Sequence, residues 1–393
     1  MTKKPSYRFA GYDEPWVEKK FGEVVKRSSK SIEDSDLPIV EYEDVISGEG
    51  RLNKNVFQKS SNKKGLFFSK DDVLFGKLRP YLQNWLLPTF TGIAVGDWWV
   101  LQSHELESKF LYTFIQTSNY QIVANLSTGT KMPRSDWNIV SESRVNFPSL
   151  PEQTAIGSFF QDIDQLISLH QRKLEVLKEQ KKTYLKLLFP AKGQTKPALR
   201  FAGFEADWKE VKLGEVFKIS SGFTGDSSLH SGSYKLTRIE TISDGLINVK
   251  KLGYSNVAPD DSYKLEVGDI LFSNINSIEH IGKVALYDKD YGLYHGINLL
   301  RLQPIDINGI FGFYELGTID KRNWTRSRAN KAVNQASINQ TILSSLNLQI
   351  PSLPEQETIS SFFQDLDKAI AKQEKKVNQL KESKQTLLRK MFI

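Results

Sequence analysis

The chain has 393 residues, of which 39% are hydrophobic and 11% aromatic, and this composition excludes an intrinsically disordered protein. At about 150 residues per domain, the length predicts two or three domains. The formal net charge of +7 favours an acidic partner, with nucleic acid as the first candidate. The absence of cysteine excludes disulfides and thiolate metal sites.

No segment of the sequence predicts a membrane protein. The N-terminal residues MTKKPSYRF contain no apolar signal region, and the most apolar stretch, 85–101, is interrupted by Pro88, Asp97 and glycine. We therefore expect a cytoplasmic protein without a membrane partner.

In chain order, the first informative feature is a short segment that occurs twice. The pattern RFAG, then Trp16, then FGEV at 21–24 recurs as RFAG, Trp208 and LGEV at 213–216, an offset of 192 residues. DVLF at 72–75 is echoed by DILF at 269–272, and both have strand character. The repeat predicts two related domains whose interiors have diverged, and hence two sites of one kind with different specificities.

Each domain contains polar loops that are candidates for a binding surface. In the first domain, residues 70–81 predict a strand followed by a basic turn, and residues 128–134 predict a flexible loop. In the second domain, residues 273–276 take the place of that turn, and residues 322–335 replace the later loop. The candidate DNA-binding residues are Lys77, Arg79, Tyr81, Lys131, Arg134, Asn274, Asn276, Arg322, Arg326, Arg328, Lys331, Asn334 and Gln335.

The residue types in these loops suit nucleic acid. Lysine and arginine bind phosphates, and Arg, Asn and Gln can form bidentate contacts with base edges. For any single residue, the alternative is an ordinary solvated charge on a surface loop.

A longer repeat links the two domains. Residues 147–189 return without a gap as residues 350–392, and apolar residues recur in both at steps of three and four. This spacing predicts helices that pack along each other, with polar interruptions, His170 and Lys181 matching Gln373 and Lys384, that fix the register. The predicted seam includes Ile163, Ile167, Leu174, Leu177 and Leu188, and Leu366, Ile370, Val377, Leu380 and Leu387.

The starts of these helices have the spacing of a capping box. Ser149 and Glu152, and again Ser352 and Glu355, are separated by three residues, with proline in the first turn. A helix from there to about Phe189 is roughly 50 to 60 Å long, which predicts a spacer. We expect an insertion of four residues near 192–195 to lengthen the distance that this spacer sets.

The sequence contains no motif for catalysis. There is no P-loop, no Gly-x-Gly-x-x-Gly after a strand, and no Asn-Pro-Pro-Tyr/Phe motif of amino-methyltransferases. The histidines lack metal-ligand spacing, and acidic pairs such as Asp162 and Asp164 lie within the helical repeat. We expect no metal site and no chemistry in this chain. The expected domains are 1–147 and 197–350, with helical regions at 148–196 and 351–393.

Two copies of PSLPEQ followed by SFFQD, together with DVLFGKLRPY and TGTKMPR, resemble the specificity subunit of type I restriction-modification systems. The resemblance implies an α+β/α fold class, with two mixed α/β target recognition domains and two long helices in an antiparallel coiled coil. It implies that each domain recognises one half of a split target in double-stranded DNA. The helices would dock two methyltransferase subunits, and restriction subunits would complete the nuclease. S-adenosylmethionine, ATP and Mg would belong to those partners, so no cofactor is expected here.

The helix length agrees with this interpretation. The roughly 25 residues from Ile163 to Leu188 span about 38 Å, close to the 34–36 Å that separates two major-groove readers on one DNA face. Phe159 and Phe362 lie beside the seam and are candidates for the methyltransferase surface, with packing onto their own domains as the alternative. Two other functions stay open, a specificity subunit of a related modification system and a bivalent coiled-coil adaptor for proteins.

Overall fold

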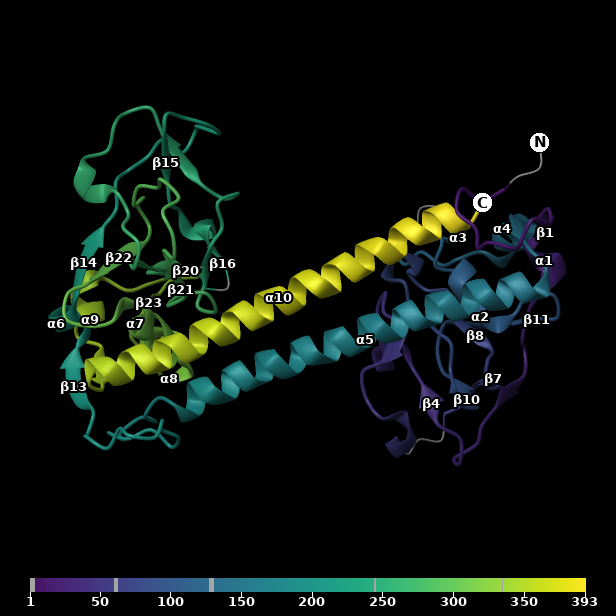
Figure 1. Cartoon of the computed structure of the whole chain (residues 1–393), viewed down its shortest axis with the longest axis horizontal. Coiled ribbons are helices and arrows are strands. Elements are labelled where there is room, and N and C mark those ends of the chain that lie inside the picture. Colours follow the sequence, from purple (N-terminus) through teal and green to yellow (C-terminus); the bar gives the residue numbers. More distant parts are fainter. Residues whose placement is uncertain (1–3, 60–62, 127–130, 244, 334) are drawn as a thin grey trace. The chain divides into compact units, whose positions relative to one another are not determined.

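A computed structural model describes residues 4–59, 63–126, 131–243, 245–333 and 335–393 (Figure 1). The chain divides into two compact units. Unit 1 comprises Met1–Leu174 with Gln373–Ile393, and unit 2 comprises Glu175–Lys372. Each unit therefore contains one mixed α/β domain and one part of each long helix, α5 (Leu150–Leu187) and α10 (Leu353–Met391).

In its described residues, unit 1 forms two four-stranded sheets, ordered β3-β7-β10-β4 and β2-β11-β8-β9, and the strand pairs β1-β12 and β5-β6. Short helices connect them and cover one end. Its strands and short helices are β1 (Val17–Lys20), α1 (Phe21–Val24), β2 (Val25–Arg27), β3 (Ser31–Ile32), β4 (Ile39–Val40), β5 (Val45–Ile46), β6 (Arg51–Leu52), β7 (Gly65–Phe68), β8 (Val73–Gly76), β9 (Trp85–Leu86), β10 (Gly92–Ala94), β11 (Trp98–Ser103), α2 (Ser108–Phe114), α3 (Ser118–Ala124), α4 (Trp137–Glu142) and β12 (Arg144–Phe147).

The described part of unit 2 forms one four-stranded sheet, β14-β22-β19-β21, a three-stranded sheet, β20-β24-β23, and the pairs β13-β25, β15-β18 and β16-β17. Its strands and short helices are β13 (Lys209–Lys212), α6 (Leu213–Val216), β14 (Phe217–Ser221), β15 (Tyr234–Leu236), β16 (Ile242–Ser243), β17 (Leu246–Ile247), β18 (Gly253–Ser255), β19 (Ile270–Phe272), β20 (Ile275–Asn276), β21 (Val284–Leu286), β22 (Leu300–Pro304), α7 (Gly309–Leu316), α8 (Ile319–Arg328), β23 (Asn330–Lys331), β24 (Ala336–Ser337), α9 (Gln340–Ser344) and β25 (Asn347–Ile350).

The two domains share a topology that extends beyond their sequence similarity. The sheets β2-β11-β8-β9 and β14-β22-β19-β21 have the same antiparallel order, and Arg27 opposite Leu101 corresponds to Ile219 opposite Leu302. The two DxLF segments form the equivalent strands β8 and β19, as predicted. This shared register identifies equivalent positions in the two domains.

The recurring RFAG segment fastens each domain to the start of a long helix. Arg8 Nε lies 2.6 Å from Glu152, and Arg200 Nε lies 2.7 Å from Glu355. Both carboxylates are buried, and a buried charge needs a charged partner. The predicted capping box is therefore wrong, because each glutamate pairs with arginine and does not reach back to the helix start.

The ends of the long helices are packed into the domain cores. Leu188 and Phe189 follow α5 and lie in the core of unit 2, and the Leu199 N–H donates to the Leu187 carbonyl oxygen at 2.9 Å. In unit 1 the Tyr7 N–H makes the equivalent bond to the Lys390 carbonyl oxygen at the end of α10. An insertion at 192–195 would enlarge the loop after this docked end, so we no longer expect it to lengthen the spacer.

The predicted seam residues are buried or half-buried, and each of the four polar interruptions makes a contact between α5 and α10. In unit 1, Lys384 Nζ lies 2.5 Å from Asp164 and donates to Gln116 Oε1 at 2.6 Å, while the Gln373 amide donates to the His170 carbonyl oxygen at 2.7 Å. These contacts join α5 to an antiparallel α10.

Unit 2 contains the matching pair. Lys181 lies 2.6 Å from Asp367, which also accepts a hydrogen bond from Tyr314 at 2.8 Å. Lys181 and Lys384 are 203 residues apart, and so are Asp164 and Asp367, so one register device is used in each unit.

Phe159 and Phe362 lie against their own units. Phe159 makes an edge contact with Phe9, with ring centroids 5.4 Å apart, and Phe362 makes one with Phe201 at 5.6 Å. These contacts correspond to the alternative that we gave for both residues. None of the helices in the part of the chain that the structure describes is long and apolar enough to cross a membrane.

Candidate nucleic-acid interface

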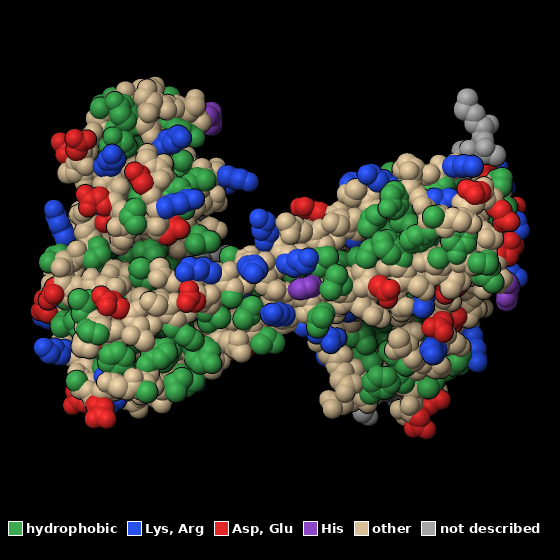
Figure 2. All heavy atoms as spheres, in the orientation of Figure 1, with side chains coloured by type: hydrophobic (Ala, Val, Ile, Leu, Met, Phe, Trp, Pro, Cys, Tyr) green, Lys and Arg blue, Asp and Glu red, His purple; other side chains and the backbone are tan. Residues whose placement is uncertain are grey.

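Charge alone does not locate a binding face. On the face shown in Figure 2, Lys and Arg side chains are interspersed with Asp and Glu in each unit. The candidate interface therefore has to be built from the predicted loops.

In unit 1 the structure brings the two predicted loops together. Leu78 forms an isolated bridge with Arg134, the Arg79 N–H donates to the Pro133 carbonyl oxygen at 2.7 Å, and the Ser135 N–H donates to Lys77 at 2.8 Å. Lys131, Arg134 and Tyr81 are exposed. Residues 127–130 of the second loop lie outside the described residues.

Asp97 organises the cations of this surface. Its carboxylate lies 3.5 Å from Lys77 Nζ and 3.1 Å from Arg134 Nη2. Partial burial would raise the pKa of Asp97, but Arg134 and Lys77 outweigh it and hold the pKa below its ordinary value. Two of the predicted phosphate contacts are therefore partly neutralised, while Lys131 has no described ionic partner.

Arg79 is held in an unusual backbone conformation at the tip of the turn. It has a φ of 49°, in the left-handed region, and precedes a short 3₁₀ helix, η3 (Pro80–Leu82). A non-glycine residue in this region is strained and is enriched at functional sites. Its buried Nε has no described hydrogen-bond partner.

The equivalent loops of unit 2 also meet. The Ile338 N–H donates to the Asn274 carbonyl oxygen at 2.9 Å, and β20 pairs with β24, which pairs with β23. This small sheet carries Asn276 and Lys331, and Gln335 precedes β24 as an exposed residue. Asn334 lies outside the described residues.

The two asparagines of this turn already have internal partners. Asn276 donates to Ser273 Oγ at 3.1 Å and accepts from the Ser277 N–H at 2.8 Å, and Asn274 donates to the Ile338 carbonyl oxygen at 3.5 Å. The bidentate base contact predicted for Asn276 would require this turn to open.

Residues 322–328 are not part of a loop, and this is a correction to the sequence analysis. They belong to α8, since the segment 319–328 contains neither glycine nor proline. Arg322 and Arg326 lie on one face at i and i+4, Arg326 donates to the Glu279 carbonyl oxygen at 2.9 Å, and Arg328 stacks on Trp324. After α8 the chain continues directly into β23 (Asn330–Lys331).

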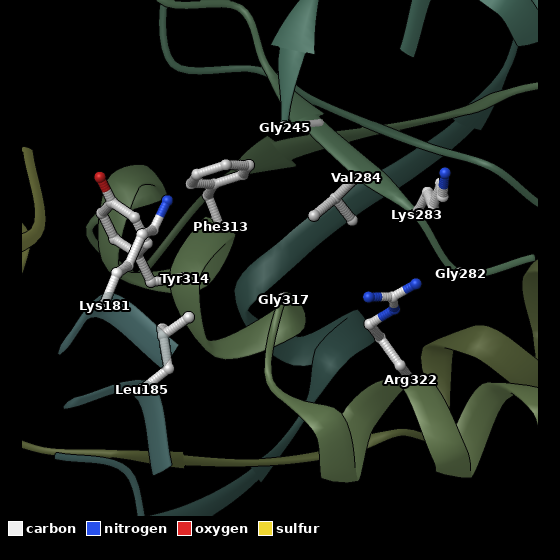
Figure 3. Close-up of a pocket in the computed structure, with 10 residues that line it drawn as sticks. All are labelled: Lys181, Leu185, Gly245, Gly282, Lys283, Val284, Phe313, Tyr314, Gly317 and Arg322. Atoms are coloured by element: carbon white, nitrogen blue, oxygen red, sulfur yellow. The ribbon is translucent and has the colours of Figure 1, made fainter. Parts of the chain in front are cut away.

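Arg322 lines a pocket of about 310 Å³. Figure 3 shows its guanidinium directed from α8 toward Gly282 and Lys283, with Lys181 and Tyr314 elsewhere on the wall. Burial lowers the pKa of Arg322, and Arg326 lowers it further. No described carboxylate pairs with Arg322, so its charge is available to an anionic ligand.

Sequence analysis missed a cluster beside Lys77. The Arg27 guanidinium lies over Trp137, 4.7 Å from the ring centroid, and 5.5 Å from that of Trp99. The sequence analysis considers Asp97-Trp98-Trp99 only as part of the apolar stretch 85–101, although a charged residue beside two tryptophans was the available signal. Among the described residues, no group of His, Asp or Glu has the arrangement of a metal site.

The fold defines a class of protein in which two related α/β domains are connected by one pair of long helices. The model of the type I restriction modification DNA specificity domain matches residues 13–179 and 205–382, which is most of the chain. The chain therefore belongs to this family.

Individual relatives agree with this assignment. A putative type I restriction enzyme specificity subunit, MjaX, of Methanocaldococcus jannaschii is 40% identical over 193 residues, covering 47% of this chain and 45% of the relative. The MjaVIII specificity subunit of the same organism is 25% identical over 282 residues, covering 66% and 64%. The matched region thus spans about half to two thirds of these relatives.

Solved structures resemble the whole chain. The type I restriction-modification S subunit from M. genitalium superimposes with a TM-score of 0.64 at 16% identity, covering 100% of this chain and 99% of that one. A chain from a study of complex assembly of the type I system gives 0.55 at 19% identity, covering 98% of both. At these identities the likeness establishes the fold.

Proposed function

We propose that this protein is the DNA-recognition subunit of a type I restriction-modification complex, in which each domain recognises one half of a bipartite, asymmetric target. The observation that carries this proposal is the pair of equivalent loop surfaces. Each surface is built on the turn that follows a strand, at Gly76 in unit 1 and at Ser273 in unit 2. The unit 1 surface carries lysine and arginine around Asp97, whereas the unit 2 surface carries amide side chains and the arginines of α8. Equal placement with different chemistry suits two half-sites of different sequence.

The helices would set the gap between the half-sites and carry the partner subunits. Each unit holds α5 and α10 with its own Lys–Asp pair, which favours a fixed register over a sliding contact. Two methyltransferase subunits would dock on this helical region, with restriction subunits completing the nuclease. Phe159 and Phe362 are half-buried, and the accessible part of each ring is the proposed contact with a methyltransferase subunit.

The proposal assigns no catalysis to this chain. S-adenosylmethionine, ATP and Mg would act on the partner subunits, in the cytoplasm where the DNA lies. The purified chain should neither methylate nor cut DNA, and methylation should appear when the methyltransferase subunit is added. Methylation by the isolated chain would contradict the proposal.

An exchange of one domain tests the division of the target. Replacing residues 10–146 with the corresponding domain of a relative should change one half-site and leave the other, as measured by sequencing methylated sites. A change in both half-sites would contradict independent recognition.

A further inference from the structure

Unit 1 contains a pocket of about 510 Å³ beside the candidate interface, within the usual size range of small-molecule sites. It lies between the edge strand β2, the start of β11, the end of β8 and the start of α4. Its lining includes Lys26, Arg27 and Lys77 and the rings of Trp98, Trp99 and Trp137. The pocket thus combines cations with aromatic surfaces.

The charges of this lining are not balanced within it. No carboxylate lines the pocket, and no described carboxylate forms an ion pair with Arg27. Burial lowers the pKa of Arg27 although Asp136 opposes the shift, so the protein bears a cost to hold this cation here. Lys77 shares Asp97 with Arg134, but Lys26 and Arg27 have no described carboxylate partner, and such cations favour an anionic ligand.

The tryptophans add unsatisfied donors. Trp98 and Trp99 are 1% and 3% exposed, and neither indole N–H has a hydrogen-bond partner among the described residues. A buried donor without an acceptor costs on the order of 1–3 kcal/mol. Because these N–H groups are fully buried, the ligand that suits the accessible lining is defined by its negative charge and a flat face.

The second domain keeps only the equivalent of Lys26, which is Lys218, and lacks the other groups. By the shared strand register, Arg27, Lys77, Trp98 and Trp99 correspond to Ile219, Asn274, Leu299 and Leu300. Trp137, the first residue of α4, corresponds to Gln340, whose side chain donates to the Ile219 carbonyl oxygen at 2.8 Å. The common scaffold does not require this cluster, so its presence in unit 1 calls for a function of that domain.

We propose that this pocket binds a nucleotide, with its phosphate on Lys26 and Lys77 and its base stacked on the Arg27–Trp137 platform. Base stacking on aromatic and arginine planes combined with a cationic groove is a general mode of nucleic-acid binding. The inference rests on the proposed function for the source of the nucleotide, which is either the bound DNA or a free mononucleotide.

Fluorine NMR of the full chain labelled with 5-fluorotryptophan can test the site. Each of the seven tryptophans gives its own signal, which substitution by phenylalanine assigns. Addition of adenosine monophosphate or of duplex DNA should shift the Trp99 and Trp137 signals and leave those of Trp208 and Trp324, which lie in unit 2. A shift with the mononucleotide identifies a free nucleotide as sufficient, and a shift with DNA alone identifies the DNA as the source.

Two variants with the same chemical change provide the comparison. Arg27→Gln should weaken the response about tenfold or more, as expected for the loss of a charged hydrogen-bonding group. Arg144→Gln removes an exposed arginine at the start of β12, outside the pocket lining, and should change nothing.

The outcomes separate this inference from the proposed function. If a mobility shift shows DNA binding while the pocket signals stay unmoved with both ligands, or if inorganic phosphate produces an equal response, the nucleotide pocket is wrong and DNA recognition stands. If the assembled complex binds no DNA but the mononucleotide shifts Trp99 and Trp137, the pocket stands and the proposed function fails.

Discussion

At the level of single residues, the two candidate surfaces differ in how their cations are held. Lys77 and Arg134 share Asp97, whereas the residue equivalent to Lys77 in unit 2 is Asn274, whose amide supports the turn. Lysines that are already paired contribute less to phosphate binding than free ones, because the carboxylate must be displaced or left close to the DNA. The exposed Lys131 should therefore matter more than Lys77.

Substitutions at this scale separate phosphate contacts from base contacts. Lys131→Ala should weaken binding of the assembled methyltransferase to all sequences and reduce the salt slope by about one, and Lys77→Ala should have a smaller effect of the same kind. Gln335→Ala should relax one half-site only. The measurement is DNA affinity against salt concentration for several sequences. A uniform loss from all three would mean that Gln335 contacts phosphate.

The buried His295 predicts an acid-sensitive unit 2. It is 1% exposed, and burial lowers its pKa to about 4, with Leu299 as the acceptor for its ring N–H. Between about pH 6.5 and 4 the unfolded state binds a proton that the folded state does not. The free energy of unfolding therefore decreases as the pH is lowered through that window. The full loss is on the order of 3 kcal/mol.

Urea unfolding at pH 7 and pH 5 measures this effect. His295→Gln should reduce the difference between the two conditions, and His230→Gln, at an exposed position, should not. An equal pH dependence in all three proteins would assign the effect to other groups.

At the level of elements, the buried Lys–Asp pairs determine how the helices fit. Lys384 is nearly buried, and burial raises the pKa of Asp164 more than Lys384 lowers it. The attraction between the two charges therefore does not fully offset the cost of burying the carboxylate. Asp164→Ala should destabilise the protein by about 3–5 kcal/mol, because it leaves a buried ammonium without its carboxylate.

The double substitution Asp164→Leu with Lys384→Met should recover most of that loss, since an apolar pair removes both charges. Chemical denaturation of the two variants provides the measurement. If the double variant is as unstable as the single one, the ion pair adds to the free energy of unfolding beyond the cost of burying its two charges.

The helices were predictable because their signals are local, and the failures involve partners distant in sequence. Apolar residues that recur at intervals of three and four identified the seam of each helix, and α5 and α10 start one residue after Ser149 and Ser352. The capping box failed because Arg8, 144 residues before Glu152, takes its carboxylate. The helix at 322–328 was missed because its arginines were weighed for chemistry before their helix propensity.

The candidate site was predictable only in part, for the same reason. The loops containing Lys77 and Arg134 were identified from composition, but their contact with each other depends on a fold in which 57 residues separate them. Arg27 lies on an ordinary edge strand, and nothing in its neighbourhood in sequence indicates that Trp137 will lie beneath it.

At the level of the whole molecule, the structure changes how the spacer should be tested. An insertion has to lie within both helices, at the boundaries between the units after Leu174 and Lys372. Residues inserted after α5 would only enlarge a loop, because Phe189 is packed in the core of unit 2. Four residues in each helix produce a stutter, which unwinds the pair locally and preserves the seam.

Such an insertion adds about 6 Å, or roughly two base pairs at 3.4 Å each. The half-sites should persist while the gap lengthens, as read from methylated sites. Insertion into α5 alone is the control, and it should disturb folding because the seam loses its register. A double-insertion variant that modifies only the original spacing would show that the helices do not measure the DNA.

The bond from Tyr7 to Lys390 in unit 1 and the bond from Leu199 to Leu187 in unit 2 have a consequence for the order of the chain. One junction is crossed by a continuous peptide and the other is held by hydrogen bonds, yet both use the same contact between a helix end and the segment before a domain. In unit 1 the first residues of the chain therefore hold the end of its last helix, as the covalent connection after α5 does in unit 2.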